Sequence, residues 1–346
     1  MAVAPMERLL AALQGLSLDS ETAVAERVAP LLYYAEAAPA FRKAYYESAA
    51  RNVLLFDALD ELKAALASKG VHPVILKGAD FARHLYPNPA LRPMSDLDFW
   101  VAPDEVTGAE SVLQTLGYRS WAPDMSPGLS RAIRHARLYV GGARNDIAVD
   151  LHWSLVRHDA ARTATYLDWF RSRVVDGRLD PTASLLYLAA HMKLQHHDES
   201  PTLLWLSDFY LLSMQLEVDF RALFDAAESF GWEGALAATV YDVQSRLGTE
   251  LPSALAAYAR PMPAPSRVPG AEHAWNELAT LSLRGRSVLL KALLFPSPAY
   301  VRFRYRPRPR WSWPLYYPLR WARILTGAAS LAFKPRRSRT LLGQVP

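Results

Sequence analysis

The residues best suited to chemistry are two aspartates that stand two positions apart, Asp96 and Asp98. They alternate with Leu97, Phe99 and Val101, which predicts a strand with both carboxylates on one face and the apolar side chains in a core. Neighbouring like charges on a strand repel, and a bound cation such as Mg²⁺ would remove that cost. Relief of this repulsion also predicts that replacing either aspartate by asparagine leaves the fold intact or more stable. The alternative is an edge strand with a solvated acidic face.

A segment upstream of the aspartates has features of a phosphate site. Residues 74–79 predict a short apolar strand that ends in Lys77 and Gly78, followed by a helix from about Asp80 to Leu85. A strand–glycine–helix turn exposes backbone N–H groups at the start of the helix, where phosphate binds well. Lys77 could add a positive charge on a phosphate.

A segment downstream provides a third carboxylate. Residues 137–140 and 147–153, separated by a glycine-rich turn, predict a β-hairpin. Alternation in the second strand places Asp150 and His152 on its polar face. A third carboxylate on a strand that can pair beside the first favours a metal site over the solvated edge strand.

These segments together resemble a known family. The Lys-Gly pair after a strand, the string Arg-Pro-Met-Ser-Asp-Leu-Asp at 92–98 and Val-Asp-Leu-His-Trp at 149–153 resemble the uncharacterised nucleotidyltransferase family of the DNA polymerase β superfamily. The similarity continues through 188–191 and 205–208, and so covers roughly residues 50–245. The sequence has Gly78-Ala79 where the superfamily usually has Gly-Ser, and Gly78 lies 18 residues before Asp96, a longer gap than is usual.

The resemblance implies a fold and a reaction. The fold would be α/β (α+β), a polymerase β-like core with a small mixed sheet flanked by helical regions. The reaction would move a nucleoside monophosphate from a nucleoside triphosphate, with ATP expected, to a hydroxyl acceptor of unknown identity, and would release pyrophosphate. Asp96 and Asp98 would bridge two Mg²⁺ ions about 3.5–4 Å apart, with Mn²⁺ as the alternative ion. Asp150 would bind only the acceptor-side ion and could take the proton of the acceptor.

The resemblance also suggests which residues contact the nucleotide. Lys77, the turn at Gly78 and Arg92 would hold the β- and γ-phosphates, with Ser95 and His191 as further contacts. His191 and Asp208 could line the cleft or be structural, and Arg92 could be a surface arginine placed by Pro93. His196 and His197 are expected to be solvated or satisfied in a core, because they point apart on a regular helix. The alternatives to nucleotidyl transfer are a phosphotransferase with the same carboxylates and a non-catalytic nucleotide-binding or membrane adaptor.

Composition limits the class of protein and its surroundings. The 346 residues are 51% hydrophobic and include no cysteine, which excludes disulfides and thiolate metal sites and agrees with a reducing cytoplasm. The N-terminus, with Glu7, Asp19 and Glu21, lacks the basic-then-apolar pattern of a signal peptide. No uncharged apolar run reaches the roughly 18–20 residues that span a bilayer. We therefore expect a cytoplasmic protein.

Patterning divides the chain into four expected regions. These are an N-terminal helical region (1–70), the α/β core (71–155), a C-terminal helical domain (156–295) and a basic, aromatic-rich tail (296–346). Apolar periodicity predicts helices over 7–16, 23–34, 40–68, 271–294 and 319–334, and a mainly helical stretch over 181–247.

The tail differs sharply in charge from the rest of the chain. It contains 11 of the 39 basic residues and none of the 34 acidic ones, so the net charge is +11 in the tail and −6 in residues 1–295. Arginines alternate with aromatic residues over 302–313. This composition fits peripheral binding to an anionic membrane surface, a tail folded back on the acidic body or, less well, nucleic-acid binding.

Overall fold

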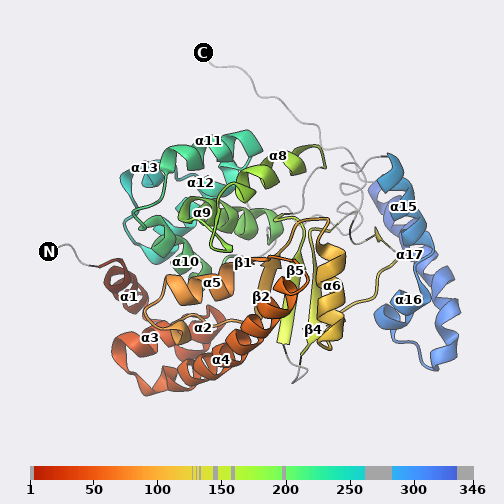
Figure 1. The fold of residues 1–346 in the computed structure, drawn as a ribbon, viewed down its shortest axis with the longest axis horizontal. Coiled ribbons are helices and arrows are strands. Elements are labelled where there is room, and N and C mark those ends of the chain that lie inside the picture. Colours follow the sequence, from red (N-terminus) through yellow and green to blue (C-terminus); the bar gives the residue numbers. More distant parts are fainter. Residues whose placement is uncertain are drawn as a thin grey trace, which may run out of the picture. The chain divides into compact units, whose positions relative to one another are not determined.

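The computed structural model describes residues 4–126, 128–129, 131, 134–142, 147–156, 160–196, 200–261 and 283–332. The chain forms two compact units (Figure 1). The core unit contains residues 1–121 and 133–265, and the basic unit contains residues 122–132 and 266–346.

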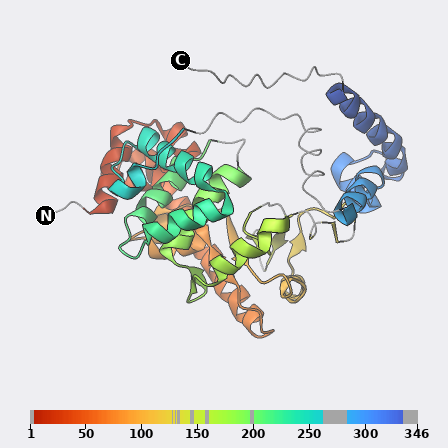
Figure 2. The same cartoon turned by 90° about the horizontal axis from the view of Figure 1, so that it is seen from above.

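Four helices precede the sheet of the core unit: α1 (Pro5–Gly15), α2 (Ser20–Ala25), α3 (Ala29–Glu36) and α4 (Pro39–Ala67). The prediction of a single helix over 23–34 is wrong, because the helix is interrupted between α2 and α3. Arg27 has a φ of 61° at this break, and Pro30 occupies the first turn of α3, where its missing N–H costs nothing. Helix α1 packs against α10 (Leu203–Ser213), as Figures 1 and 2 both show.

The described residues of the core unit form one mixed sheet of seven strands in the order β3-β4-β5-β2-β1-β7-β6. The strands are β1 (Val74–Leu76), β2 (Asp96–Trp100), β3 (Arg119–Ser120), β4 (Ala136–Gly141), β5 (Ile147–His152), β6 (Val174–Val175) and β7 (Arg178–Leu179). Strands β4 and β5 are antiparallel, which confirms the predicted hairpin. Strand β2 lies inside the sheet between β5 and β1, so the edge-strand alternative is wrong.

Helices cover the two faces of the sheet. Helix α4 and helix α6 (Val106–Thr115) pack on one face, where Leu97, Phe99 and Val149 join their apolar side chains in one core cluster. The other face contributes Leu76 and Trp100 to a second cluster, formed mainly with the helices that follow the sheet. Helix α5 (Lys77–His84) and the short 3₁₀ turn η1 (Pro89–Leu91) connect β1 to β2. This α/β arrangement confirms the expected fold class.

The helices that follow β5 are α8 (Ala160–Arg171), α9 (Pro181–Ala190), α10, α11 (Phe220–Phe230), α12 (Glu233–Asp242) and α13 (Ser253–Ala256). Two turns of π-helix, η2 (His191–Gln195) and η3 (Val243–Leu247), continue α9 and α12. The stretch over 181–247 is therefore mainly helical, as expected.

Residues 283–332 of the basic unit are mainly helical. It contains α15 (Leu283–Leu294), α16 (Pro298–Tyr305), the 3₁₀ segment η4 (Arg310–Leu315) and α17 (Tyr316–Ala332). Arg320 Nε and Trp321 Nε1 of α17 donate to the carbonyls of Leu293 and Leu294, which ties α17 to α15. Residues 271–282 and 333–334 of the two helices expected here lie outside the described residues. Among the described helices, none is long and apolar enough to cross a membrane.

Candidate active site

The carboxylates meet because β2 and β5 pair in parallel. Their register places Asp98 beside Asp150 and Asp96 beside Ala148. Leu97 is buried on the opposite face, as alternation predicts. Two ionised aspartates side by side on adjacent strands repel each other, so the fold must place positive charge next to them.

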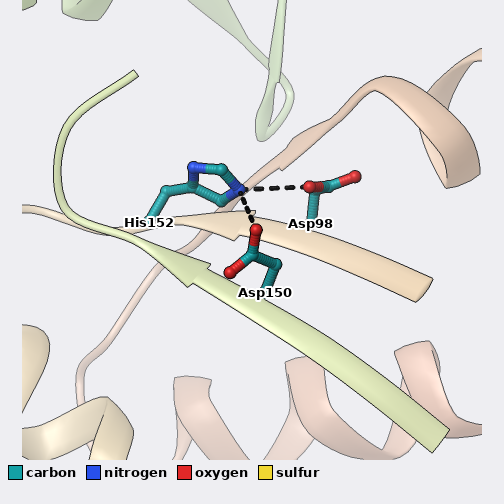
Figure 3. Close-up of side chains that lie close together, drawn as sticks. All are labelled: Asp98, Asp150 and His152. Atoms are coloured by element: carbon teal, nitrogen blue, oxygen red, sulfur yellow. Dashed lines mark hydrogen bonds and ion pairs between the residues drawn. The ribbon is translucent and has the colours of Figure 1, made fainter. Parts of the chain in front are cut away.

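Two cationic side chains provide that charge. His152 Nε2 lies 3.1 Å from Asp98 Oδ1 and 3.3 Å from Asp150 Oδ2, between the two carboxylates (Figure 3). Lys77 Nζ lies 3.0 Å from Asp98 Oδ1. Asp98 and His152 are almost fully buried, whereas the Asp150 side chain is 28% exposed. Asp150 is therefore the member of this cluster that an incoming molecule can reach most easily.

The electrostatics follow from these contacts. Burial alone would lower the pKa of His152, but Asp150 and Asp98 outweigh it and raise this pKa to about 9. Burial would likewise raise the pKa of Asp98, but Lys77 and His152 hold it well below its ordinary value. Burial opposes the charge on Lys77, and Asp98 overcomes this effect and raises the lysine pKa. The cluster is thus ionised at neutral pH and internally paired.

Asp98, Asp150 and His152 also fit a divalent metal ion. One ligand atom of each lies within 4.8 Å of the others. Two carboxylate oxygens and an imidazole nitrogen form a donor set that binds Mg²⁺ or Mn²⁺ through oxygen and transition ions also through nitrogen. In the metal-free arrangement the His152 imidazolium supplies the positive charge between the carboxylates. A divalent ion there would let His152 bind as the neutral base.

Asp96 and Ser95 lie at the edge of this cluster. Asp96 is on the same face of β2 as Asp98, but it is outside the group of three close ligands. It accepts a hydrogen bond of 2.8 Å from the Ser95 hydroxyl. Burial and the nearby Asp98 raise the pKa of Asp96, which is the opposite of the shift at Asp98. The structure therefore places the three carboxylates together but gives them unequal surroundings.

Lys77 begins α5 in an uncommon backbone conformation. Its φ of 41° lies in the left-handed region, which a residue with a side chain seldom adopts. Such strain concentrates at functional sites because the surrounding structure must enforce it. Here it accompanies the sharp turn from β1 into α5, next to Gly78. An added Cβ at Gly78 would lie only 3.3 Å from Arg92 Nη1, so the glycine leaves room for the arginine.

Arg92 is held in place by Asp208 of α10. Its Nη2 and Nε donate to Asp208 at 2.7 and 3.2 Å, in a bidentate pair of two buried side chains. Tyr86 donates its hydroxyl to the same carboxylate at 2.8 Å. Within the described residues Arg92 is therefore not the surface arginine of the alternative interpretation. Asp208 is fully buried and fixes Arg92.

A cavity of about 540 Å³ joins these groups within the core unit. This volume is in the usual range for a small-molecule site. The lining residues come from widely separated parts of the chain: Arg27, Lys77, Gly78, Arg92, Met94, Ser95, Asp96, Asp98, His135, Asp150, His191, Gln195, His196 and Trp205. All eight residues expected at the site thus line one cavity. Arg27 donates to the Pro93 carbonyl at 3.0 Å, and burial next to Arg92 lowers its pKa.

His191 lies on the side of the cavity formed by the C-terminal helices. Its ring nitrogens are 3.5 Å from Lys77 Nζ. Burial and the positive charge of Lys77 lower the pKa of His191, so the ring is neutral. His191 and His196 are five residues apart and join through the π-turn, in which the His196 N–H donates to the His191 carbonyl at 3.2 Å. This turn brings the centroids of the two rings to 4.7 Å from each other, and His196 lines the cavity, whereas it was expected to be solvated or satisfied in a core. His197 lies outside the described residues.

Some contacts at the site were not expected from the sequence. Arg27 comes from the N-terminal region, and only Pro30 three residues later indicated a break in the helix there. His152 was placed on the correct face, but its position between two carboxylates depends on the register of β2 and β5. His135 has its ring centroid 5.6 Å from that of His152, and no motif indicated this contact.

The family comparison agrees with this geometry. A family model described as an uncharacterised nucleotidyltransferase matches residues 21–248. The match includes the whole cavity and begins before Arg27, earlier than the resemblance seen in the sequence. No curated protein and no solved structure matches the chain. Because the family model covers more than half of the sequence, the chain belongs to this uncharacterised nucleotidyltransferase family, a family of transferases.

Proposed function

We propose that the protein transfers a nucleoside monophosphate from a nucleoside triphosphate, with ATP as the expected donor, to a hydroxyl acceptor. The oxygen of the acceptor forms a bond to the α-phosphorus, the bond from that phosphorus to the bridging oxygen breaks, and pyrophosphate leaves. The main support is the in-register pair Asp98 and Asp150, which faces a cavity lined by basic side chains.

Different residues of the cavity would have different roles in the reaction. Arg27, Lys77 and Arg92 line it and would bind the β- and γ-phosphates, with Lys77 at the start of α5. Asp150, the more exposed carboxylate, would orient the acceptor hydroxyl and accept its proton. Asp98 and Asp150, together with Asp96 or His152, would hold the divalent metal, Mg²⁺ or Mn²⁺. The metal would stabilise the negative charge that develops on the transferred phosphoryl group.

Labelled ATP tests this proposal and separates it from phosphoryl transfer. The full chain is incubated with ATP labelled at the α- or the γ-phosphate, a divalent metal and a panel of hydroxyl compounds, peptides and RNA. Label from the α position in an acceptor, together with released pyrophosphate, is the expected result. Label from the γ position alone would make the protein a phosphotransferase. Absence of transfer with every acceptor, despite ATP binding, would favour the adaptor.

For the basic unit we propose a peripheral contact with an anionic membrane surface. Residues 283–332 contain no acidic residue, and large apolar side chains stand exposed beside the arginines. Trp311 is 74% exposed and Leu315 is 67% exposed. Basic residues near an anionic bilayer each add about 1 kcal/mol, and tryptophan favours the membrane interface. This position would bring the core unit close to acceptors at the inner membrane surface.

A further inference from the structure

The wall of the cavity near α10 is made of aromatic rings. The ring centroids of His191 and Trp205 are 5.3 Å apart, those of His196 and Trp205 are 5.2 Å apart, and those of the two histidines are 4.7 Å apart. All three residues line the cavity. Hereafter this group is called the aromatic wall.

The aromatic wall depends on a rare turn of helix. On a regular α-helix, residues five apart point in different directions, whereas the π-turn at 191–195 brings His196 back over His191. Gln195 within the turn bonds to both His191 and the Leu155 carbonyl, which fixes the turn to the end of the sheet region. Turns of this kind occur mostly as single insertions and often at functional sites.

Helix α10 connects the aromatic wall to the phosphate side of the cavity, which is the part lined by Lys77, Gly78 and Arg92. Trp205 and Asp208 are three residues apart on α10 and therefore lie on the same side of the helix. Asp208 holds Arg92, whose Nη1 reaches toward Gly78 at the start of α5. A molecule with a flat ring at one end and anionic groups at the other would thus meet two features fixed by α10.

From this arrangement we propose that the aromatic wall is the subsite for the base of the nucleoside triphosphate, with Trp205 as the main stacking surface. The inference rests on the proposed function. Nucleobases stack on aromatic side chains without needing specific hydrogen bonds, and larger rings stack more strongly. The aromatic wall therefore favours purine over pyrimidine nucleotides.

Binding of a base can be separated from binding of phosphate by using two ligands. Titration calorimetry with Mg²⁺ compares an α,β-methylene analogue of ATP, which cannot donate its nucleotide, with inorganic tripolyphosphate. For Trp205→Ala we expect a loss of affinity for the analogue of about 5- to 150-fold, and no more than about a twofold change for tripolyphosphate. Trp205→Phe should retain most of the affinity. Trp121→Ala removes a tryptophan that is 58% exposed and outside the cavity lining, and should change neither affinity.

Each other result would overturn the inference in a distinct way. An unchanged affinity of Trp205→Ala for the analogue would show that the base binds elsewhere. An equal loss for both ligands, without recovery in Trp205→Phe, would make Trp205 structural. If the wild-type protein binds both ligands equally well, the base subsite is wrong while the phosphate site stands. If the wild-type protein binds neither ligand, both the subsite and the proposed function are wrong.

Discussion

The core unit and the basic unit use positive charge in opposite ways. In the core unit Lys77, Arg92 and His152 are buried, and each pairs with a carboxylate that the fold places within 2.7 to 3.1 Å. In the basic unit the arginines Arg304 and Arg308 are exposed, and residues 283–332 of that unit contain no acidic residue. Buried pairs fix geometry inside a site, whereas exposed charges of one sign act at longer range on an external anion. The comparison predicts which substitutions affect chemistry and which affect attachment.

The largest effect should come from Asp98→Asn. The change removes a metal ligand and the shared partner of Lys77 and His152, so transfer should fall at least about a thousandfold. It should also lower the free energy of unfolding by roughly 3–5 kcal/mol, since two buried cations lose a carboxylate. Initial rates and urea denaturation measure the two effects. Near wild-type turnover would contradict the metal site, and unchanged stability would contradict the buried pairing.

Loss of charge from the basic unit should affect attachment alone. The triple substitution of Arg304, Arg308 and Arg310 by serine should weaken binding to anionic liposomes by about 3 kcal/mol, or about a hundredfold. The control replaces Lys43, Lys63 and Lys69, three exposed lysines of the core unit, by serine and thus changes the net charge equally.

Liposome flotation at low and high salt measures this binding, which should weaken with salt because charges are screened over roughly 8 Å at physiological ionic strength. Equal losses in the two triple variants would show that only net charge matters. If the wild-type chain does not bind at low salt, the membrane proposal is wrong. Transfer to a small acceptor in solution should stay unchanged in both variants.

Tyr86→Phe tests whether Asp208 orients Arg92 toward the phosphates. The change removes a hydrogen bond of 2.8 Å to the buried Asp208 and should lower the free energy of unfolding by about 1.5–3 kcal/mol. Affinity for tripolyphosphate should fall severalfold, because Asp208 then holds Arg92 less firmly. Tyr34→Phe, at an exposed tyrosine, is the matched control. Loss of stability without any loss of affinity would show that Asp208 does not orient Arg92.

The smallest effect is expected for the stability of Asp96→Asn. Because the fold raises the pKa of Asp96, its ionised form costs stability at neutral pH. The amide should therefore stabilise the protein by roughly 0.2–1 kcal/mol at pH 7. This gain should vanish as the pH falls below the ordinary aspartate pKa of about 3.9. At that pH Asp96 is protonated, and therefore as neutral as the asparagine that replaces it. A loss of stability at pH 7 would mean that Asp96 is a paired carboxylate like Asp98.

The two aspartates show where sequence patterns stop being informative. Alternation with Leu97 and Phe99 was enough to place both carboxylates on one face and to predict the hairpin that contains Asp150. It could not give the register of β2 and β5, and so could not show that His152 and Lys77 pair with Asp98. From the sequence both asparagine variants were expected to leave the fold intact or more stable, whereas the structure leads us to expect opposite effects.

Helical periodicity had a similar limit. It located most helices of the core unit, because buried apolar residues recur at the spacing of an α-helix. It assumed 3.6 residues per turn, a geometry in which residues five apart such as His191 and His196 point in different directions, whereas the π-turn brings these two together. It also missed the break at Arg27, since a positive φ in a residue other than glycine leaves no periodic signal. Both errors fall on residues that line the cavity, where local rules yield most often to tertiary structure.

The break between α2 and α3 also has a practical consequence for fragments of this protein. Glu26, at this break, accepts hydrogen bonds from the Leu203 N–H at the start of α10 and from Arg246. Its neighbour Arg27 lines the cavity. A shortened chain that starts at residue 71 would retain every conspicuous motif. It would nevertheless expose the first turn of α10 and lack one of the three basic side chains proposed to bind phosphate. A minimal fragment for crystallisation should therefore begin before α2.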